Sequence, residues 1–136
     1  MNKPRFDVRF DEDAYKEYMK LDNSVAEIVD KALEELEARA DEVGKILVNK
    51  QSTKLHGCKE IKLRDAGIRI VFRVTNEKVN VLPIVYVLSI EKRADEVVFN
   101  LADKRLRRFK VRPDLKKHLS HSKRWELRRR GDKRPN

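Results

Sequence analysis

Alternating apolar and charged residues predict a two-stranded β-hairpin in the middle of the chain, between Gly57 and Arg73. Ile61 and Leu63 alternate with charged residues, so the period of two places both apolar side chains on one face of the first strand. The tripeptide 65–67 supplies the turn, because its glycine readily adopts a positive φ. The return strand repeats the alternation with three apolar side chains on one face: Ile68, Ile70 and Phe72.

Helical periodicity marks three other segments. Asp11 is placed to cap a first helix that runs to about Lys20. The capping-box pattern at residues 24–27 opens a second helix. A third helix is expected from Ala94 to about Arg107. The second helix has the clearest apolar stripe, with six residues at i, i+3, i+4, i+7, i+8 and i+11: Val25, Ile28, Val29, Ala32, Leu33 and Leu36.

Two further strands complete the expected fold. Residues 5–10 alternate apolar with charged side chains, and residues 79–90, which follow a predicted turn at 76–78, are rich in β-branched and aromatic residues. Pro83 interrupts the second run, which indicates an edge position or a bulge. The order β-α-α-β-β-β-α predicts an α+β fold in which a helical hairpin packs on an antiparallel sheet.

The 136 residues suit one domain, which we place at 1–107, followed by a basic C-terminal extension at 108–136. Residues 1–104 carry 19 Lys+Arg and 20 Asp+Glu, whereas residues 105–136 carry 14 Lys+Arg and 3 Asp+Glu. The net charge of +10 therefore arises at the C-terminal end. Such a concentration of positive charge attracts polyanions, although many basic extensions are only solvated appendages.

The extension has few apolar residues to bury. Asp114 could begin a fourth helix and Gly131 could end it, with Leu115, Leu119 and Trp125 on one side. Because three apolar residues bury little surface, we expect this extension to be either disordered or helical, with folding on binding as one route to the helix. Trp125 could stack on a nucleobase or pack back onto the domain.

Basic residues outnumber acidic ones on the polar face of the predicted hairpin. Lys62, Arg64, Arg69 and Arg73 share this face, where neighbouring like charges repel. An antiparallel sheet can leave one face to water, so a solvated face is one interpretation. Because a solvated face usually mixes charges of both signs, we favour an anion-binding surface.

Several classes of protein are disfavoured. No apolar run approaches the ~20 residues of a membrane helix, and the N-terminus lacks a signal peptide's apolar stretch, so we expect a cytoplasmic protein. Cys58 is the only cysteine, which rules out an internal disulfide. His56 lies two residues from Cys58, and His118 lies three from His121, but neither pair has further ligands at a suitable spacing. We expect no metal or other cofactor.

The chain resembles the RelE/ParE superfamily of bacterial toxin–antitoxin toxins. The resemblance is carried by short motifs in and around the hairpin and by a helix that ends in residues 104–106. The resemblance covers residues 5–106, and the tripeptide 55–57 with the pair 92–93 makes it closer to RelE than to ParE. The motifs are Leu55-His56-Gly57-Cys58, Ile61-Lys62-Leu63-Arg64, Gly67-Ile68-Arg69-Ile70-Val71-Phe72-Arg73-Val74, Lys92-Arg93 and Lys104-Arg105-Leu106.

The resemblance implies the toxin of a type II toxin–antitoxin system, with a cognate antitoxin, the ribosome and mRNA as partners. RelE-type toxins are ribosome-dependent endoribonucleases, or mRNA interferases, and they inhibit translation. The resemblance further implies that a 2′-hydroxyl attacks the adjacent phosphate without a metal. The alternatives are a ParE-like toxin that acts on DNA gyrase and a nucleic-acid-binding module with little or no catalysis.

The resemblance also implies roles for particular residues. Where RelE usually has a lysine and a tyrosine, this chain has Glu60 and Phe99. Phe99 could still stack on RNA but cannot transfer a proton, so activity is expected to be reduced. Glu60 could replace the missing base, or it could form a salt bridge with Arg69. The implied catalytic cations are Lys62, Arg64, Arg69 and Arg93, and the expected RNA-binding residues are Lys59, Arg73, Arg105, Arg108 and Trp125.

Overall fold

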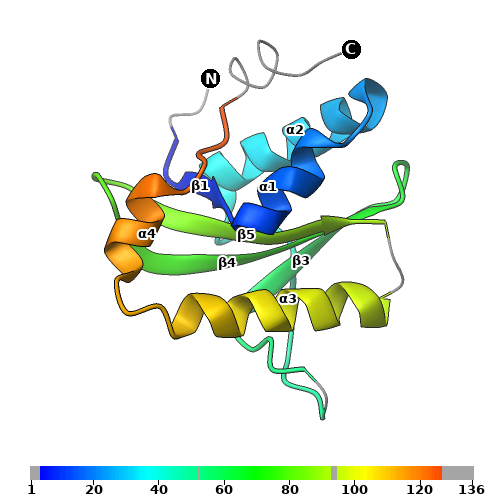
Figure 1. Ribbon diagram of the computed structural model, residues 1–136. Helices are drawn as coiled ribbons and strands as arrows, with labels where there is room; N and C mark the ends of the chain where they lie inside the picture. The colour runs from blue at the N-terminus through cyan, green and yellow to red at the C-terminus, as the bar shows by residue number, and fades with distance from the viewer. Residues whose placement is uncertain (1–3, 52, 93–94, 127–136) are drawn as a thin grey trace.

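A computed structural model describes residues 4–51, 53–92 and 95–126, which form helices on both faces of a twisted sheet (Figure 1). Helices α1 and α2 cover one face, and α3 lies across the other. The elements are β1 (Asp7–Phe10), α1 (Glu12–Met19), α2 (Asn23–Arg39), β2 (Lys45–Ile46), β3 (Cys58–Leu63), β4 (Ile68–Lys78), β5 (Pro83–Glu91), α3 (Asp95–Lys110) and α4 (Leu115–His121).

The strand order is β1-β5-β4-β3-β2, and the helical hairpin packs on the sheet, so the predicted α+β fold is confirmed. Strands β2 to β5 pair antiparallel, whereas β1 joins β5 in parallel and makes the sheet mixed. Parallel pairing requires a long connection between the two strands. The α1–α2 hairpin and the strands that follow it supply that connection.

The central hairpin matches the prediction. Ile61 lies opposite Ile70 and Lys62 lies opposite Arg69 in the β3–β4 register. Gly67 in the turn has a φ of 65°, a value that glycine adopts at little cost. The apolar and basic faces of this hairpin are therefore set by its own alternation.

The predicted turn at residues 76–78 is wrong, because β4 continues through Lys78. The connection instead occupies residues 79–82, and Pro83 is the first residue of β5. A proline is tolerated at the first position of a strand. Strand β5 is internal, between β1 and β4, so the edge position is wrong. The other expectation, a bulge, agrees with the register shift of the β4–β5 ladder between Val74 and Lys78, the residue that pairs with Pro83.

Two hydrophobic clusters lie on opposite faces of the sheet. On the α1–α2 face, the apolar stripe of α2 packs on Phe10, Ile70 and Phe72. On the α3 face, Val98 and Leu106 of α3 pack among Tyr86, Leu88 and Val71. Burial of these stripes is the main favourable term in folding and fixes the helices on the sheet.

The C-terminal extension is part of the same fold as far as Glu126. Helix α3 runs through the predicted boundary between residues 107 and 108. Helix α4 begins at Leu115, directly after Asp114, where the sequence predicted the start of a fourth helix. Helix α4 ends at His121, ten residues before Gly131. Leu119 of α4 is 1% exposed, so disorder is the wrong expectation for this part of the extension. Residues 127–136 lie outside the described residues.

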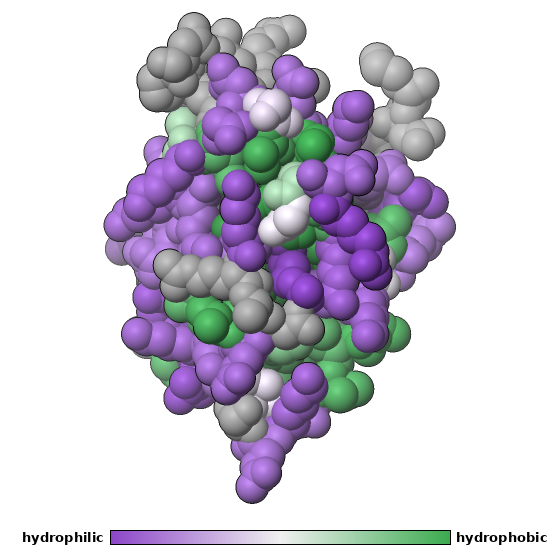
Figure 2. Space-filling model, turned by 90° about the vertical axis from the view of Figure 1, so that its right-hand side faces the viewer, coloured by the Kyte–Doolittle hydropathy of each residue, from purple (hydrophilic) through white to green (hydrophobic). Residues whose placement is uncertain are grey.

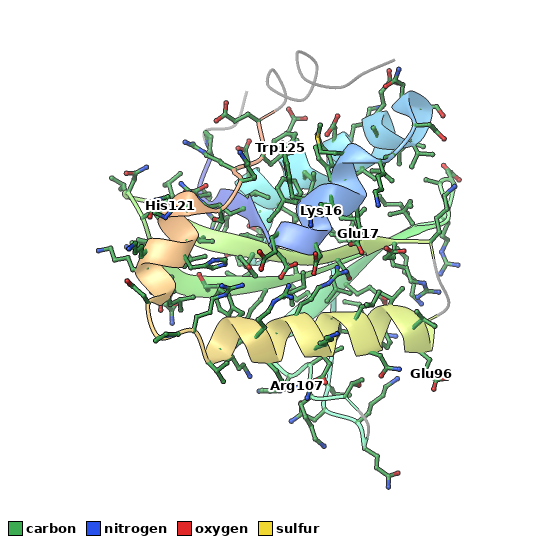
Figure 3. All side chains as sticks on the ribbon, in the orientation of Figure 1. Lys16, Glu17, Glu96, Arg107, His121 and Trp125 are labelled. Atoms are coloured by element: carbon green, nitrogen blue, oxygen red, sulfur yellow. The ribbon has the colours of Figure 1, made fainter. Side chains whose placement is uncertain are left out.

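The segment 122–126 covers the outer edge of β1. The Phe10 amide donates to the Lys123 carbonyl at 2.9 Å, and the Trp125 amide donates to the Val8 carbonyl at 2.8 Å. Trp125 enters the cluster on the α1–α2 face, beside α2, where it is 3% exposed (Figure 3). Its Nε1 donates to Oδ1 of Asp30 at 3.1 Å. Of the two interpretations of Trp125, packing back onto the domain is the correct one.

Candidate functional site

Cations gather in a small cleft at the end of the β3–β4 hairpin, where β5 also ends. Figure 2 views the molecule from this side and shows hydrophilic side chains over most of the face. The cleft has a volume of about 280 Å³. Its lining residues are Lys62, Leu63, Arg64, Gly67, Ile68, Arg69 and Lys92. Three of the four predicted catalytic cations thus come together.

The cations lie close because of the strand register. Lys62 and Arg69 are direct cross-strand partners, a like-charge arrangement that destabilises a sheet unless it is compensated. Glu60, on the same face of β3, compensates with Oε2 at 3.3 Å from Nη1 of Arg69. The Glu60 side chain is 2% exposed and that of Arg69 is 25% exposed. The buried carboxylate therefore orients a guanidinium that still reaches solvent.

Arg73 lies on the same face but outside the cleft. It pairs with Cys58, the first residue of β3, whereas Lys62 lies near the end of that strand. Its Nη1 donates to the His56 carbonyl at 3.2 Å, and a Cβ added at Gly57 would lie 2.5 Å from the same nitrogen. Gly57 has a φ of 91°, so backbone conformation and space both favour glycine here. Burial raises the pKa of the neighbouring Cys58 thiol.

Lys59 belongs to the opposite face of β3. Its Nζ donates to the carbonyls of Ala40 and Asp41, at 3.3 and 3.2 Å, near the end of α2. Successive side chains of a strand point to opposite faces, so Lys59 cannot share the face of Lys62. Lys59 is therefore not part of the cleft.

Two predicted RNA-binding arginines instead connect α3 to the region around α1. Arg105 is 7% exposed, with Nη2 at 2.8 Å from Oε2 of Glu17, a residue labelled on α1 in Figure 3. Arg108 contacts Asp11 at 2.9 Å and Asp13 at 3.2 Å. A charge that is paired within the protein contributes little to the attraction of an external phosphate. The structure places both arginines in ion pairs within the protein, and their RNA-binding role stays a prediction.

The two aromatic residues expected to stack on RNA are both buried, and their stacking stays a prediction. Phe99 is 8% exposed and packs in the cluster on the α3 face, with Nζ of Lys50 at 5.2 Å from its ring centroid. Trp125 is buried as described above. Neither ring can stack on a base while it occupies its place in the core.

One of the four cations that line the cleft was missing from the predicted site. Lys92 lines the cleft with Lys62, Arg64 and Arg69. The sequence did contain an indication of Lys92, because this residue forms part of the basic pair at the end of the last strand. The other member of that pair, Arg93, lies outside the described residues, and its predicted role stays a prediction.

A cleft with this composition suits a phosphate group. Lysine and arginine donors around a small volume stabilise the charge of a phosphodiester, and more strongly when a second charge develops on it. Among residues 4–51, 53–92 and 95–126, no group of three or more His, Cys, Asp and Glu side chains could hold a metal ion. Over the same ranges, no helix is both long and apolar enough to cross a membrane.

Comparison with known proteins decides the family. The chain is 39% identical over 98 residues to the mRNA interferase toxin RelE of Escherichia coli K12, a match that covers 71% of this chain and 93% of the relative. The chain belongs to the RelE family of toxins. No protein-family model matches it.

Solved RelE structures agree with this assignment. A mutant of E. coli RelE in the free state superposes with a TM-score of 0.58 at 33% identity, over 76% of this chain and 99% of that one. The toxin in the intact E. coli RelBE toxin–antitoxin complex gives a TM-score of 0.50 at 37% identity, over 65% and 98%. These RelE proteins are covered almost whole, so the present chain is the longer one.

Proposed function

We propose that this RelE-family chain is the toxin of a type II toxin–antitoxin system and cleaves mRNA on the ribosome. The cationic cleft of Lys62, Arg64, Arg69 and Lys92 carries the proposal, because it gathers in one small volume the positive charge that phosphodiester cleavage requires. A similar protein is named an mRNA interferase, and another was solved with an antitoxin. The proposed place of action is the cytoplasm, where ribosomes translate.

The proposed reaction needs charge stabilisation above all. The 2′-oxygen bonds to the adjacent phosphorus while the bond from phosphorus to the 5′-oxygen breaks, which leaves a cyclic 2′,3′-phosphate and a free 5′-hydroxyl. Negative charge grows on the phosphoryl oxygens and on the leaving oxygen at the transition state. Fixed guanidinium and ammonium donors stabilise that charge without reorganisation. Arg69 suits this role because Glu60 already orients it.

Proton transfer is the weaker part of this site. Among the described residues that line the cleft, none has a carboxylate or an imidazole. Glu60 is buried against Arg69, and Phe99 has no hydroxyl. Positioned proton transfer contributes ~10²–10⁴-fold to a rate, so we expect slower cleavage than by a relative with the tyrosine. On this basis Glu60 is a positioning residue for Arg69 and not a general base.

Primer extension on an abundant message tests the proposal, in a translating extract and in the same extract cleared of ribosomes. The parent protein should produce cuts within the translated frame only when ribosomes are present. Arg69→Ala should lower the cleavage rate by roughly 10²–10³-fold, as loss of one transition-state donor does elsewhere. Arg39→Ala, which removes an exposed arginine on α2, is the matched control and should cut normally. Absence of cuts in the extract, together with growth arrest of cells that express the protein, would overturn the proposal and direct attention to gyrase.

Glu60→Gln separates positioning from base catalysis. If Glu60 only orients Arg69, the variant should cleave several-fold more slowly with an unchanged pH profile. Loss of the acidic limb of the profile, with a rate ~10²-fold or more below the parent, would instead identify Glu60 as the base.

A further inference from the structure

The outward side of α4 carries two lysines, a serine and a histidine, and no acidic residue. Positions i, i+1, i+4 and i+5 of a helix lie on one side of it. We call this exposed surface the α4 face, and its residues are Lys116, Lys117, Ser120 and His121. His121 is labelled on α4 in Figure 3. The opposite side of the helix holds Leu115 and Leu119, which pack in the cluster on the α3 face.

Contacts on the inner side hold α4 in place. Nε2 of His118 lies 3.1 Å from the hydroxyl of Tyr86 in β5. Arg9 of β1, with a side chain 7% exposed, donates from Nη1 to the Leu119 carbonyl at 2.8 Å and to the Ser122 carbonyl at 3.4 Å. Oδ2 of Asp7, at 3.0 Å from Nε of Arg9, orients this arginine in turn. The lysines of the α4 face are therefore carried by a packed helix and not by a solvated appendage.

The arginines and the lysines of the extension are used differently. Three arginines pair with carboxylates of the preceding domain: Arg108 with Asp11 at 2.9 Å, Arg112 with Glu12 at 2.9 Å, and Arg124 with Asp7 at 3.4 Å. Lys116 and Lys117, by contrast, form no ion pair with any of the described residues. Their charges consequently remain available to an external anion.

The α4 face lies too far from the cationic cleft to act through its electric field. Figure 1 shows α4 toward the β4–β5 turn, whereas the β3–β4 turn and the end of β5 lie at the other end of the sheet. Tyr86, which contacts α4, precedes Lys92 of the cleft by six residues along β5. A strand of that length spans about 20 Å, more than twice the Debye length of about 8 Å at physiological ionic strength. An anion that the α4 face attracts must therefore contact it directly.

The chemistry of the α4 face suits a phosphate backbone. Proteins that bind single strands use exposed aromatic rings on which successive bases stack. Between residues 110 and 126 the only Phe, Tyr or Trp is Trp125, which is 3% exposed. Lysine and serine side chains contact phosphate and sugar oxygens in nucleic-acid complexes. Helical RNA presents these oxygens across a wide, shallow minor groove, which a convex helix surface can approach.

We propose that the α4 face binds the phosphate backbone of a helical segment of RNA, separate from the strand that enters the cationic cleft. The inference rests on the proposed action on the ribosome, because ribosomal RNA supplies helical segments close to the message. Helix α4 lies beyond residues 5–106, over which the chain resembles the RelE family. This contact is thus assigned to the extension of the present chain.

The test measures binding of the full chain to an RNA duplex of about sixteen base pairs, the length that one double-stranded-RNA module spans. Its riboses carry 2′-O-methyl groups, so the proposed reaction cannot cut it. The amide resonances of Lys116 and Lys117 should shift most strongly. A single RNA strand of the same length and a DNA duplex of the same sequence should each bind at least about threefold more weakly. Comparable binding of either control, or shifts centred elsewhere, would overturn the proposal.

Paired variants separate the α4 face from general attraction to a basic protein. Lys116→Gln with Lys117→Gln should weaken duplex binding at least about tenfold at about 0.1 M salt, and the slope of log affinity against log salt should become shallower by about 1.5–2. Lys20→Gln with Lys31→Gln removes two exposed charges near α1 and on α2 and should change the affinity less than about twofold. Equal losses in both double variants would refute the site.

Two readouts keep this inference distinct from the proposed function. Duplex binding is measured without cleavage, so a protein that binds the duplex through α4 but cuts no mRNA would support the inference and refute the nuclease. In the ribosome-dependent assay, the α4 double variant should need about tenfold more protein for half the maximal cleavage rate, with that maximal rate unchanged. Equal cleavage by this variant and the parent at every protein concentration would refute the α4 contact and leave the nuclease in place.

Discussion

Trp125→Ala tests whether the basic C-terminal residues belong to the fold. Trp125 is 3% exposed in the cluster on the α1–α2 face, and its Nε1 donates to Asp30. Replacing a buried tryptophan by alanine costs about 3–5 kcal/mol, mostly through lost packing and the cavity left behind. Asp30 keeps the Tyr18 hydroxyl as a donor at 2.6 Å, so the variant does not leave it unpaired. We therefore expect a loss of about 4 kcal/mol, close to the lower limit of ordinary domain stability.

Urea unfolding followed by far-ultraviolet circular dichroism measures this loss. With a slope of about 2 kcal/mol per molar urea, the midpoint should fall by about 2 M. Trp125→Phe keeps most of the packing but removes the hydrogen bond, and should cost about 1–2 kcal/mol. Val111→Ala is the matched control in the same extension, because Val111 is 77% exposed, and it should stay within about 0.5 kcal/mol of the parent.

A particular pattern of results would refute this reasoning. If Trp125→Ala and Val111→Ala both leave the midpoint unchanged, then the C-terminal residues do not pack as described. A chain shortened after residue 108 should also be destabilised, since it loses Trp125 and the Leu119 side chain together. Normal stability of that shortened chain would contradict the fold in the same way.

Three further outcomes are expected. Gly57→Ala should cost about 1–2 kcal/mol more than Gly67→Ala in urea unfolding, since both have positive φ but only the first brings a Cβ against Arg73. Burial lowers the pKa of His118, so the unfolded chain binds more protons than the folded chain as the pH falls below about 6.5. From pH 7.5 to 5.5, the melting temperature of the parent should therefore drop more than that of His118→Gln. An equal drop in both proteins would contradict this. Burial raises the pKa of Cys58, so its thiol should react with a disulfide reagent at pH 8 only on unfolding, and rapid reaction of the folded protein would be inconsistent with its place in the core.

Local patterns in the chain determined much of the site. The β3–β4 hairpin follows from alternation and from Gly67, so Lys62 and Arg69 had to share a face once the turn was placed. The apolar stripe of α2 likewise identified the face that packs on the sheet. Side-chain direction within one strand or helix depends on backbone period alone, and that is why these predictions needed no tertiary information.

Partners distant in sequence were decided only by the tertiary structure. Nothing local indicated that Arg105 would pair with Glu17 across 88 positions, or that Trp125 would reach Asp30 across 95. The role of a cation depends on whether a carboxylate or solvent lies beside it. The pattern of residues along the chain does not show which carboxylates fold close to a given cation. The two possibilities for Trp125 could not be separated from local pattern, because the groups to which it donates, the Val8 carbonyl and the Asp30 carboxylate, lie more than ninety positions earlier.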